Sequence, residues 1–210
     1  MKKDLLIIGA GGFGRETYCL VQAINAVNET WQILGFVDDV EPDQTKLNRL
    51  GTKWLGSRAV LETFQGASYV VAISNTNVRS ELVEIAEQSD LNSATLIHPN
   101  VNIGLDVHIG PGSILNAGVS LTTNVVLGAH VQLNPGVLVG HDTEISDFVS
   151  IYPGATIGGN VQIGVGSTIG ANVTVLQGIS IGHFAVLGAG SVVTKSVSNF
   201  AIAKGVPARQ

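Results

Sequence analysis

The sequence is poor in several features that mark common protein classes. It has a single cysteine, Cys19, so an internal disulfide is excluded and a reducing compartment such as the cytoplasm is expected. Only 13% of the residues are charged, the net charge is −5, and no basic run offers the phosphate contacts that nucleic acid requires. No apolar stretch approaches the roughly 18 residues that span a bilayer. We therefore expect a soluble, cytoplasmic protein that binds neither nucleic acid nor membrane.

Apolar residues and glycine, in contrast, are plentiful. Apolar residues make up 45% of the 210 positions and glycine occupies 26 of them, which indicates buried backbone rather than disorder. The length allows one large domain or two small ones, so the internal pattern has to decide. That pattern predicts a first domain at residues 1–95, a second at 96–195 and a C-terminal tail at 196–210.

A glycine-rich motif lies near the start of the first domain. The pattern G-x-G-x-x-G occupies residues 9–14, between a predicted buried strand at 4–10 and a helix that begins near Arg15. Glycines let such a turn approach a pyrophosphate, and the helix N-terminus adds a partial positive charge. A tight turn without any ligand is the alternative. We favour a site for the diphosphate of a nucleotide, with contacts from Gly9, Gly11, Gly12, Phe13 and Gly14.

Polar residues follow two further predicted strands of this domain. Asp38 and Asp39 end the first of these strands, where a carboxylate commonly binds a ribose or a base. Ser74 and Asn75 begin the polar turn after the second strand, and we expect them to contact the same ligand. The sequence therefore predicts a nucleotide-shaped pocket at one edge of a sheet.

The alternation of strands and helices predicts an α/β, Rossmann-like domain. The strands are expected at 33–37 and 69–73, and a helix at 78–87 follows the second of them. An NAD-dependent reductase is disfavoured, because only about 95 residues precede the second domain and these make half of a dinucleotide fold.

The second domain has an uninterrupted six-residue period. An aliphatic residue occurs at every sixth position from 97 to 193, and a small or β-branched residue follows four positions later. This is the hexapeptide signature of a parallel β-helix, in which three hexads close a coil of eighteen residues. A purely structural β-helix is the alternative to an enzyme. The aliphatic residues are Ile97, Ile103, Ile109, Leu115, Leu121, Leu127, Leu133, Val139, Ile145, Ile151, Ile157, Ile163, Ile169, Val175, Ile181, Leu187 and Val193.

Histidine is the natural candidate for a base in this domain, since residues 97–194 contain no lysine or arginine. His141 stands out among five histidines, because Asp142 follows it and the interior Val139 lies two residues before it. Histidine titrates near neutral pH, and a carboxylate can orient its ring and favour the imidazolium. Backbone N–H groups or the amide of Asn134 are candidates for stabilising an oxyanion.

Cations appear only after the last hexad. Lys195, Lys204 and Arg209 are candidates for contact with the phosphates of coenzyme A, and ordinary surface charge is the equal alternative. No pair of histidines has the spacing of metal ligands on a common element, so we expect no metal site.

These motifs together resemble the sialic acid O-acetyltransferase family over essentially the whole chain. The resemblance is carried by the glycine motif, the two aspartates at 38 and 39, Gly140-His141-Asp142 within hexads, Asp147-Phe148, and the sequence GVPAR at 205–209. This family includes N-acetyltransferases of nucleotide-linked 4-amino sugars. The resemblance implies an all-β, left-handed parallel β-helix, although general crossover statistics favour the right hand. It also implies a homotrimer, acetyl-CoA as co-substrate, and a first domain that holds the sugar nucleotide.

The resemblance assigns roles to individual residues. It makes His141 the catalytic base, with Asp142 and Asn134 as its catalytic partners, and it places Gly11, Asp38 and Asp39 at the sugar nucleotide. Two positions depart from it, since some relatives have histidine where this chain has Phe13 and Ser150, which leaves the sugar open. The expected acetyl-CoA contacts are Ser150, Gly170, Gly188, Lys195, Lys204 and Arg209.

The sequence therefore predicts an acetyl-CoA-dependent N-acetyltransferase that acts on a nucleotide-linked 4-amino sugar by direct transfer. O-acetylation of sialic acid or another sugar hydroxyl is the alternative within the same class, because both reactions share these motifs. A non-catalytic trimeric scaffold that binds nucleotides is the alternative from another class.

Overall fold

The computed structural model describes residues 2–210, which form two compact units divided between Leu96 and Ile97. Residues 196–210 belong to the second unit. No helix within the described residues is both long and apolar enough to cross a membrane.

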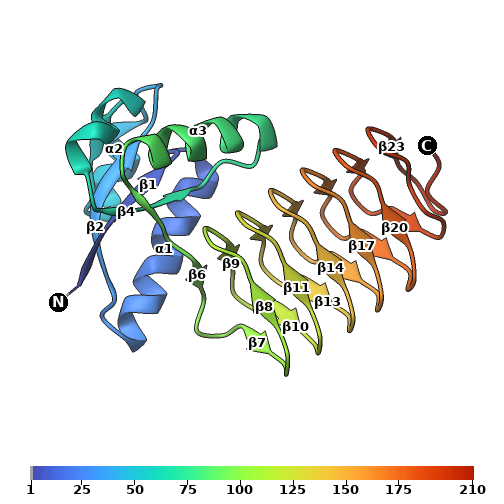
Figure 1. Cartoon of the computed structure of the whole chain (residues 1–210). Coiled ribbons are helices and arrows are strands. Elements are labelled where there is room, and N and C mark those ends of the chain that lie inside the picture. Colours follow the sequence, from blue (N-terminus) through green and yellow to red (C-terminus); the bar gives the residue numbers. More distant parts are fainter. Residues whose placement is uncertain (1) are drawn as a thin grey trace. The chain divides into compact units, whose positions relative to one another are not determined.

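The first unit is a parallel sheet of five short strands with helical crossovers. The strands lie in the order β3-β2-β1-β4-β5 and all pair in parallel. This confirms the predicted Rossmann-like α/β fold. In chain order the elements are β1 (Lys3–Ile8), α1 (Gly12–Val27), β2 (Trp31–Val37), α2 (Gln44–Leu50), β3 (Trp54–Gly56), the 3₁₀ helix η1 (Arg58–Phe64), β4 (Ser68–Val71), α3 (Thr76–Gln88) and β5 (Asn92–Ser93) (Figure 1).

Helix α1 begins inside the glycine motif, three residues earlier than the predicted start near Arg15. Gly11 is the N-cap in extended conformation, and its carbonyl accepts the first helical hydrogen bond, from the backbone N–H of Arg15 at 3.2 Å. The predicted start was wrong because glycines in a first turn are read as loop, although they cost little where the backbone is capped. The motif therefore joins β1 to α1 through only three residues, 9–11.

Two glycines of the motif are required by close packing. A Cβ added to Gly14 would lie 1.9 Å from the carbonyl oxygen of Gly9, so the first turn of α1 touches the end of β1. Gly9 itself has φ of +104°. A Cβ added to Gly9 would lie 2.9 Å from the carbonyl oxygen of Ala72, the residue that follows the neighbouring strand β4. Gly11 and Gly12, in contrast, face open space. The first pair shapes the turn, and the second pair leaves room beside the N-terminus of the helix.

The second unit is a parallel β-helix whose coils are built from three sheets (Figure 1). Residues that pair within a sheet are eighteen apart in the sequence, as Leu121 and Val139 are. The fold is the predicted left-handed β-helix. The seven-stranded sheet holds β6 (Leu96–Ile97), β9 (Ile114–Leu115), β12 (Gln132–Leu133), β15 (Ser150–Ile151), β18 (Thr168–Ile169), β21 (Val186–Leu187) and β23 (Ile202–Ala203).

The two other sheets complete the triangle. The six-stranded sheet holds β7 (Asn102–Ile103), β10 (Ser120–Leu121), β13 (Leu138–Val139), β16 (Thr156–Ile157), β19 (Thr174–Val175) and β22 (Val192–Val193). The five-stranded sheet holds β8 (His108–Ile109), β11 (Val126–Leu127), β14 (Glu144–Ile145), β17 (Gln162–Ile163) and β20 (Ser180–Ile181).

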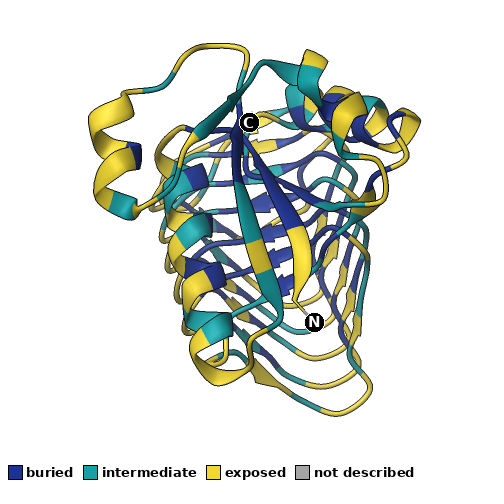
Figure 2. Ribbon diagram, turned by 90° about the vertical axis from the view of Figure 1, so that its left-hand side faces the viewer, coloured by how far each residue is buried: buried dark blue, intermediate teal, exposed yellow. Residues whose placement is uncertain are grey.

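The hexad aliphatics fill the interior of these coils. Each of the seventeen predicted residues is the second residue of a two-residue strand, and from Leu115 onward each of them is fully or almost fully buried. Figure 2 shows the buried strand positions repeating along the stack. Because successive residues of a strand point to opposite faces, the first residue of each strand faces outward. The six-residue period thus follows from one interior aliphatic residue per strand, and the small or β-branched residue four positions later is also buried in most hexads.

The last coil is shorter than the others. Leu187 pairs with Ala203, sixteen positions later, and Ile181 forms an isolated bridge with Val197, also sixteen positions later. The chain then turns back, so that Lys204 and Arg209 form an antiparallel bridge. The period of six therefore ends where the pairing slips by two residues.

Substitution of Gly14 tests the packing of the glycine motif. Gly14→Ala should destabilise the protein by about 1–3 kcal/mol, because the methyl group would overlap backbone atoms that cannot move aside. In a thermal unfolding experiment, Gly14→Ala should therefore have a lower melting temperature than the parent protein. Gly12→Ala is the matched control and should melt like the parent protein, since its Cβ meets open space. Equal melting temperatures for both variants would contradict this account.

Candidate functional site

His141 lies at a corner of the β-helix. We call corner 1 the turns that follow strands of the seven-stranded sheet, corner 2 those that follow the six-stranded sheet, and corner 3 those that follow the five-stranded sheet. Residues 140–143 form corner 2 of one coil, directly after β13. Thr143 points inward and is fully buried, and its hydroxyl donates to the Gly158 carbonyl at 3.0 Å. This anchor holds the turn while His141 and Asp142 stay exposed.

The imidazole of His141 contacts the neighbouring carboxylate. Its Nδ1 lies 2.7 Å from Oδ2 of Asp142, and the two side chains are 60% and 58% exposed. A carboxylate only accepts hydrogen bonds, so in the neutral ring the proton belongs on Nδ1. Nε2 then carries the lone pair. The carboxylate thus orients the ring, and the role of His141 as a base stays a prediction.

The backbone also favours an acid at position 142. Asp142 has φ of +57°, as Asn124 and Asn160 do at the same corner of the adjacent coils. Asp and Asn adopt this left-handed conformation more easily than other residues with a side chain. The conformation alone thus explains an Asp or Asn here. What distinguishes Asp142 is that its carboxylate reaches the histidine.

Gly159 provides a seat for the imidazole ring that sequence reasoning missed. A Cβ added to Gly159 would lie 2.5 Å from Nε2 of His141 and within 2.9 Å of two ring carbons. The backbone does not need glycine here, since the other sixteen hexads carry a side chain at this position. A signal was therefore visible: one glycine, eighteen residues after the histidine, in an otherwise occupied column.

Asn134 lies at a different corner from His141. It follows β12 at corner 1, whereas His141 follows β13 at corner 2. Its side chain is buried, and Nδ2 donates to the Ile151 carbonyl at 3.1 Å. Asn116 makes the equivalent bond to Leu133 one coil earlier, so the pair forms an asparagine ladder. Within one chain the structure does not bring the Asn134 amide to the histidine.

The residues expected at acetyl-CoA fall on two corners and one strand. Gly170, Gly188 and Lys204 follow strands of the seven-stranded sheet at corner 1, the corner of Asn134. Lys195 is at corner 2, three coils beyond His141. Ser150 is the buried first residue of β15, and Arg209 pairs with Lys204 near the C-terminus. Asn134 and three of these six candidates thus share a corner that is not the corner of His141.

The carboxyl edge of the first unit's sheet has a cavity of about 210 Å³. Its lining includes Gly9, both predicted acids and Arg58, together with apolar side chains from β1, β2 and α3. Asp38 is already engaged, because Oδ2 accepts from the Ala10 backbone at 2.8 Å and Oδ1 accepts from Val40 at 3.0 Å. Asp38 therefore ties the glycine turn to the end of β2.

Asp39 is engaged as well, and its partner was not predicted from the sequence. Oδ1 accepts from the backbone N–H of Arg58 at 2.9 Å, and Oδ2 accepts from the guanidinium. The backbone hydrogen bond from Arg58 lowers the pKa of Asp39 below its usual range, and the guanidinium adds to this shift. The hydrogen bonds that Arg58 donates to Asp39 and Glu81 raise the pKa of its guanidinium. Both members of the pair stay charged at neutral pH.

The turn after β4 has a structural role in capping α3. Asn75 is the N-cap, and its Oδ1 accepts from the Val78 backbone at 3.1 Å. The Ser74 carbonyl accepts from the buried Arg79 guanidinium at 3.2 Å. The cap explains an asparagine at position 75 without a ligand, whereas the contact of Ser74 uses only its backbone. The predicted substrate contacts of Ser74 and Asn75 stay predictions. Phe13 lies in the first turn of α1, where its carbonyl accepts from Thr17 Oγ1 at 2.9 Å.

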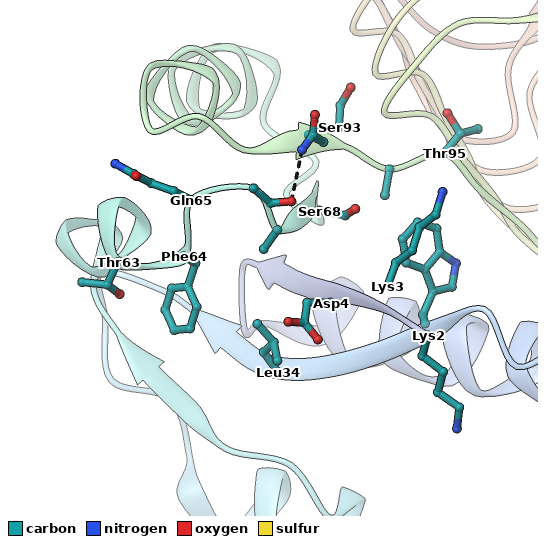
Figure 3. A pocket seen from close by; sticks show the side chains of 15 residues that line it. Lys2, Lys3, Asp4, Leu34, Thr63, Phe64, Gln65, Ser68, Ser93 and Thr95 are labelled. Atoms are coloured by element: carbon teal, nitrogen blue, oxygen red, sulfur yellow. Dashed lines mark hydrogen bonds between the residues drawn. The ribbon is translucent and has the colours of Figure 1, made fainter.

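A larger cavity, of about 990 Å³, lies at the opposite edge of the sheet. The amino ends of the strands line it, and Figure 3 shows Lys3, Asp4, Ser68 and Ser93 around it. Ligands of open α/β sheets bind outside the carboxyl ends of the strands. We therefore assign the nucleotide-shaped site to the smaller cavity beside the glycine motif. Among the described residues, no group of three histidine, cysteine or acidic side chains is placed to hold a metal ion.

Comparison with known families divides the chain in the same way as its sequence patterns do. Residues 4–86 match the PglD N-terminal domain. Residues 100–135 match the hexapeptide repeat of succinyl-transferase, and residues 142–177 match the bacterial transferase hexapeptide of six repeats. The chain thus combines a region that matches the PglD N-terminal domain with two regions that match hexapeptide repeats. No curated protein sequence matches it.

Solved structures match nearly the whole chain. The acetyltransferase domain of PglB from Neisseria gonorrhoeae is 28% identical, covers 99% of both chains and has a TM-score of 0.89. WeeI from Acinetobacter baumannii is 29% identical, covers 99% of both chains and has a TM-score of 0.87. A histidine-to-asparagine variant of perosamine N-acetyltransferase from Caulobacter crescentus, in complex with CoA and GDP-perosamine, is 26% identical over 98% of this chain and 95% of that one, with a TM-score of 0.85.

Gly159→Ala tests whether the glycine seats the imidazole. The methyl group should push the exposed ring of His141 away from its position over the turn, and the ring can move at little cost in stability. We expect little change in melting temperature and at least a tenfold loss of whatever activity depends on His141. Val165→Ala, at the same hexad position on corner 3, is the control. Full activity in Gly159→Ala would show that the ring needs no seat.

Proposed function

We propose that the chain is an acetyl-CoA-dependent N-acetyltransferase that modifies the amino group of a nucleotide-linked 4-amino sugar. The observation that carries the proposal is the His141–Asp142 pair on a hexapeptide β-helix that follows a PglD N-terminal domain. Relatives that match 98–100% of the chain are described as a perosamine N-acetyltransferase and as an acetyltransferase domain, with GDP-perosamine and CoA or with acetyl-CoA. Acyl transfer is therefore the chemistry that fits both units.

The reaction needs one proton acceptor and no covalent enzyme intermediate. The amine of the sugar attacks the thioester carbonyl, so that a C–N bond forms and the C–S bond breaks. Nε2 of His141 takes the proton that the attacking amine loses, and it returns this proton to the departing thiolate of CoA. Asp142 keeps Nδ1 protonated and stabilises the imidazolium that exists between these two steps. His141 is the catalytic residue, and Asp142 positions it.

The residues at the corner of His141 indicate how acetyl-CoA would extend along the β-helix. Lys195 lies on the same corner, three coils farther along. Neighbouring parallel strands are about 4.8 Å apart, so the two residues are separated by roughly 14 Å. An extended CoA molecule with its thioester at His141 would bring its phosphates toward Lys195. Ser150, Gly170, Gly188, Lys204 and Arg209 complete the proposed contact set.

In a homotrimer, a neighbouring copy can exclude water from His141 and bring the oxyanion donor that one chain holds at another corner. His141 is 60% exposed, whereas acyl transfer requires a site that excludes water. Asn134, the proposed oxyanion donor, lies at another corner of the coil. In a ring with rotational symmetry, different surfaces of neighbouring copies face each other, so corner 1 of one copy can meet corner 2 of the next. We propose that the active site forms in this way, in a cytoplasmic enzyme.

The nucleotide of the acceptor belongs at the carboxyl edge of the first unit. Gly11 and Gly12 border open space at the N-terminus of the sixteen-residue helix α1, which suits a diphosphate. Neither carries a side chain that would keep the ligand away from the backbone. The proposed contacts also include Gly9, Phe13, Gly14, Asp38, Asp39, Ser74 and Asn75.

Thiol release from acetyl-CoA tests the proposal directly. The purified protein is assayed with UDP-, GDP- and dTDP-linked 4-amino sugars, and with sialic acid in parallel. Release that depends on one amino sugar establishes N-acetylation. Release with sialic acid alone would assign the protein to O-acetylation, and no release with any acceptor would contradict the proposed enzyme.

His141→Ala should lower turnover by about a hundredfold or more, the usual effect of removing a general base. His108→Ala is a matched control, because His108 is also an exposed histidine beside an aspartate, with Nε2 3.4 Å from Oδ1 of Asp106. That variant should keep full activity. Circular dichroism should show the same β-helix in both variants. Near-normal turnover in His141→Ala would remove the proposed base.

A further inference from the structure

The cavity at the carboxyl edge of the first unit contains one cation, Arg58, among its lining residues. Arg58 is the first residue of η1 and comes nineteen positions after Asp39. Its side chain is 35% exposed, so it is partly withdrawn from water but open to a ligand. Apolar side chains of Ile8, Val37 and Ile73 form other walls of the same cavity.

Two carboxylates hold the guanidinium in place. Nε donates to Oδ2 of Asp39 at 2.5 Å, and Nη1 donates to Oε1 of Glu81 at 2.5 Å. Nη2 forms an ion pair with the same Oδ2 of Asp39 at 2.5 Å. The backbone N–H of Arg58 also binds Asp39, so the acid fixes both the start of η1 and the side chain. Arginine loses less conformational freedom on binding when it is held in this way.

The contacts with Asp39 and Glu81 leave part of the Arg58 guanidinium free to bind a ligand. A guanidinium has five N–H donors, and hydrogen bonds to Asp39 and Glu81 use two of them. N–H groups that remain on the terminal nitrogens can donate to a ligand in the cavity. The flat face of the group can also stack on a planar ring. A fixed flat donor beside apolar walls is suited to a heterocycle that carries carbonyl oxygens.

The charges around Arg58 argue against a phosphate in this position. Asp38, Asp39 and Glu81 contribute three negative charges near a single positive one. A diphosphate would meet a net negative cavity here, whereas the glycine motif offers it backbone N–H groups at a helix N-terminus. The phosphates and the base of one nucleotide therefore belong to different parts of this edge.

We propose that Arg58, clamped by Asp39 and Glu81, is the residue that selects the nucleobase of the sugar nucleotide. It binds a base with exocyclic carbonyl oxygens, which are present in guanine, uracil and thymine, and discriminates against adenine, which has none. Asp39 also acts as a positioning residue for Arg58. The inference rests on the proposed function, because it takes a sugar nucleotide as the ligand.

Isothermal titration of the full-length protein tests the selection. GDP, UDP, dTDP, ADP and inorganic pyrophosphate are titrated into the parent protein and into the variants Arg58→Ala, Arg58→Lys and Arg49→Ala. The parent protein should bind at least one of the first three at least tenfold more tightly than ADP. Arg58→Ala should weaken that nucleotide about tenfold or more, reduce its preference over ADP, and leave pyrophosphate unchanged. Arg49, an exposed arginine on α2, is the control and should change nothing.

Arg58→Lys decides the question if Arg58→Ala folds poorly. Lysine keeps the charge opposite Asp39 and Glu81 but lacks the planar fork, so the preference over ADP should still fall. Unchanged preference in a folded variant would overturn the proposal, and so would an equal loss for nucleotide and pyrophosphate, which would make Arg58 a phosphate ligand. Thiol release separates this failure from failure of the enzyme assignment. Activity with an amino-sugar nucleotide, together with unchanged nucleotide selectivity in Arg58→Lys, would reject only the role of Arg58, whereas a parent protein that binds no nucleotide would reject both.

Discussion

Backbone hydrogen bonds between successive coils are the constraint on which the second unit depends. The N–H of Leu138 donates to Ala155 at 3.0 Å and that of Gly140 donates to Ile157 at 2.8 Å, and the same pattern recurs from coil to coil. This pairing puts residues eighteen positions apart directly above one another. Sites on the β-helix are therefore columns, and the neighbours of His141 are set by register. Asp142 at the same turn and Gly159 one coil on both follow from this geometry.

The repeat made most of this unit predictable from the sequence. One interior aliphatic per strand gives a period of six. Each of the seventeen predicted residues is the second residue of a two-residue strand, and those from Leu115 onward are buried. The first unit was less predictable. Its glycine motif and three of its strands were recognised, but Arg58 reaches Asp39 only through β3 and η1, two short elements without a periodic pattern. Contacts of that kind depend on how the chain turns back, which local pattern does not encode.

The polar residues at the strand ends show that a place after a strand does not by itself identify a ligand contact. Asp38, Asp39 and Asn75 were singled out as ligand contacts because of their places after strands, yet each satisfies backbone N–H groups of the protein itself. Acidic and amide side chains are common at such points because turns and helix starts leave donors unpaired. A motif of this type locates the edge where a ligand can bind. It does not decide which side chain touches the ligand.

The slip of two residues in the last coil has a consequence for self-association. A regular stack of parallel strands ends in three rows of unpaired backbone groups, which are templates for further strands from other molecules. Here the final strand β23 is only two residues long, the chain turns back in the bridge between Lys204 and Arg209, and Lys195 places a charge at the same end. Charged side chains and very short edge strands discourage such growth. The irregular end thus protects a highly repetitive fold from polymerising along its own axis.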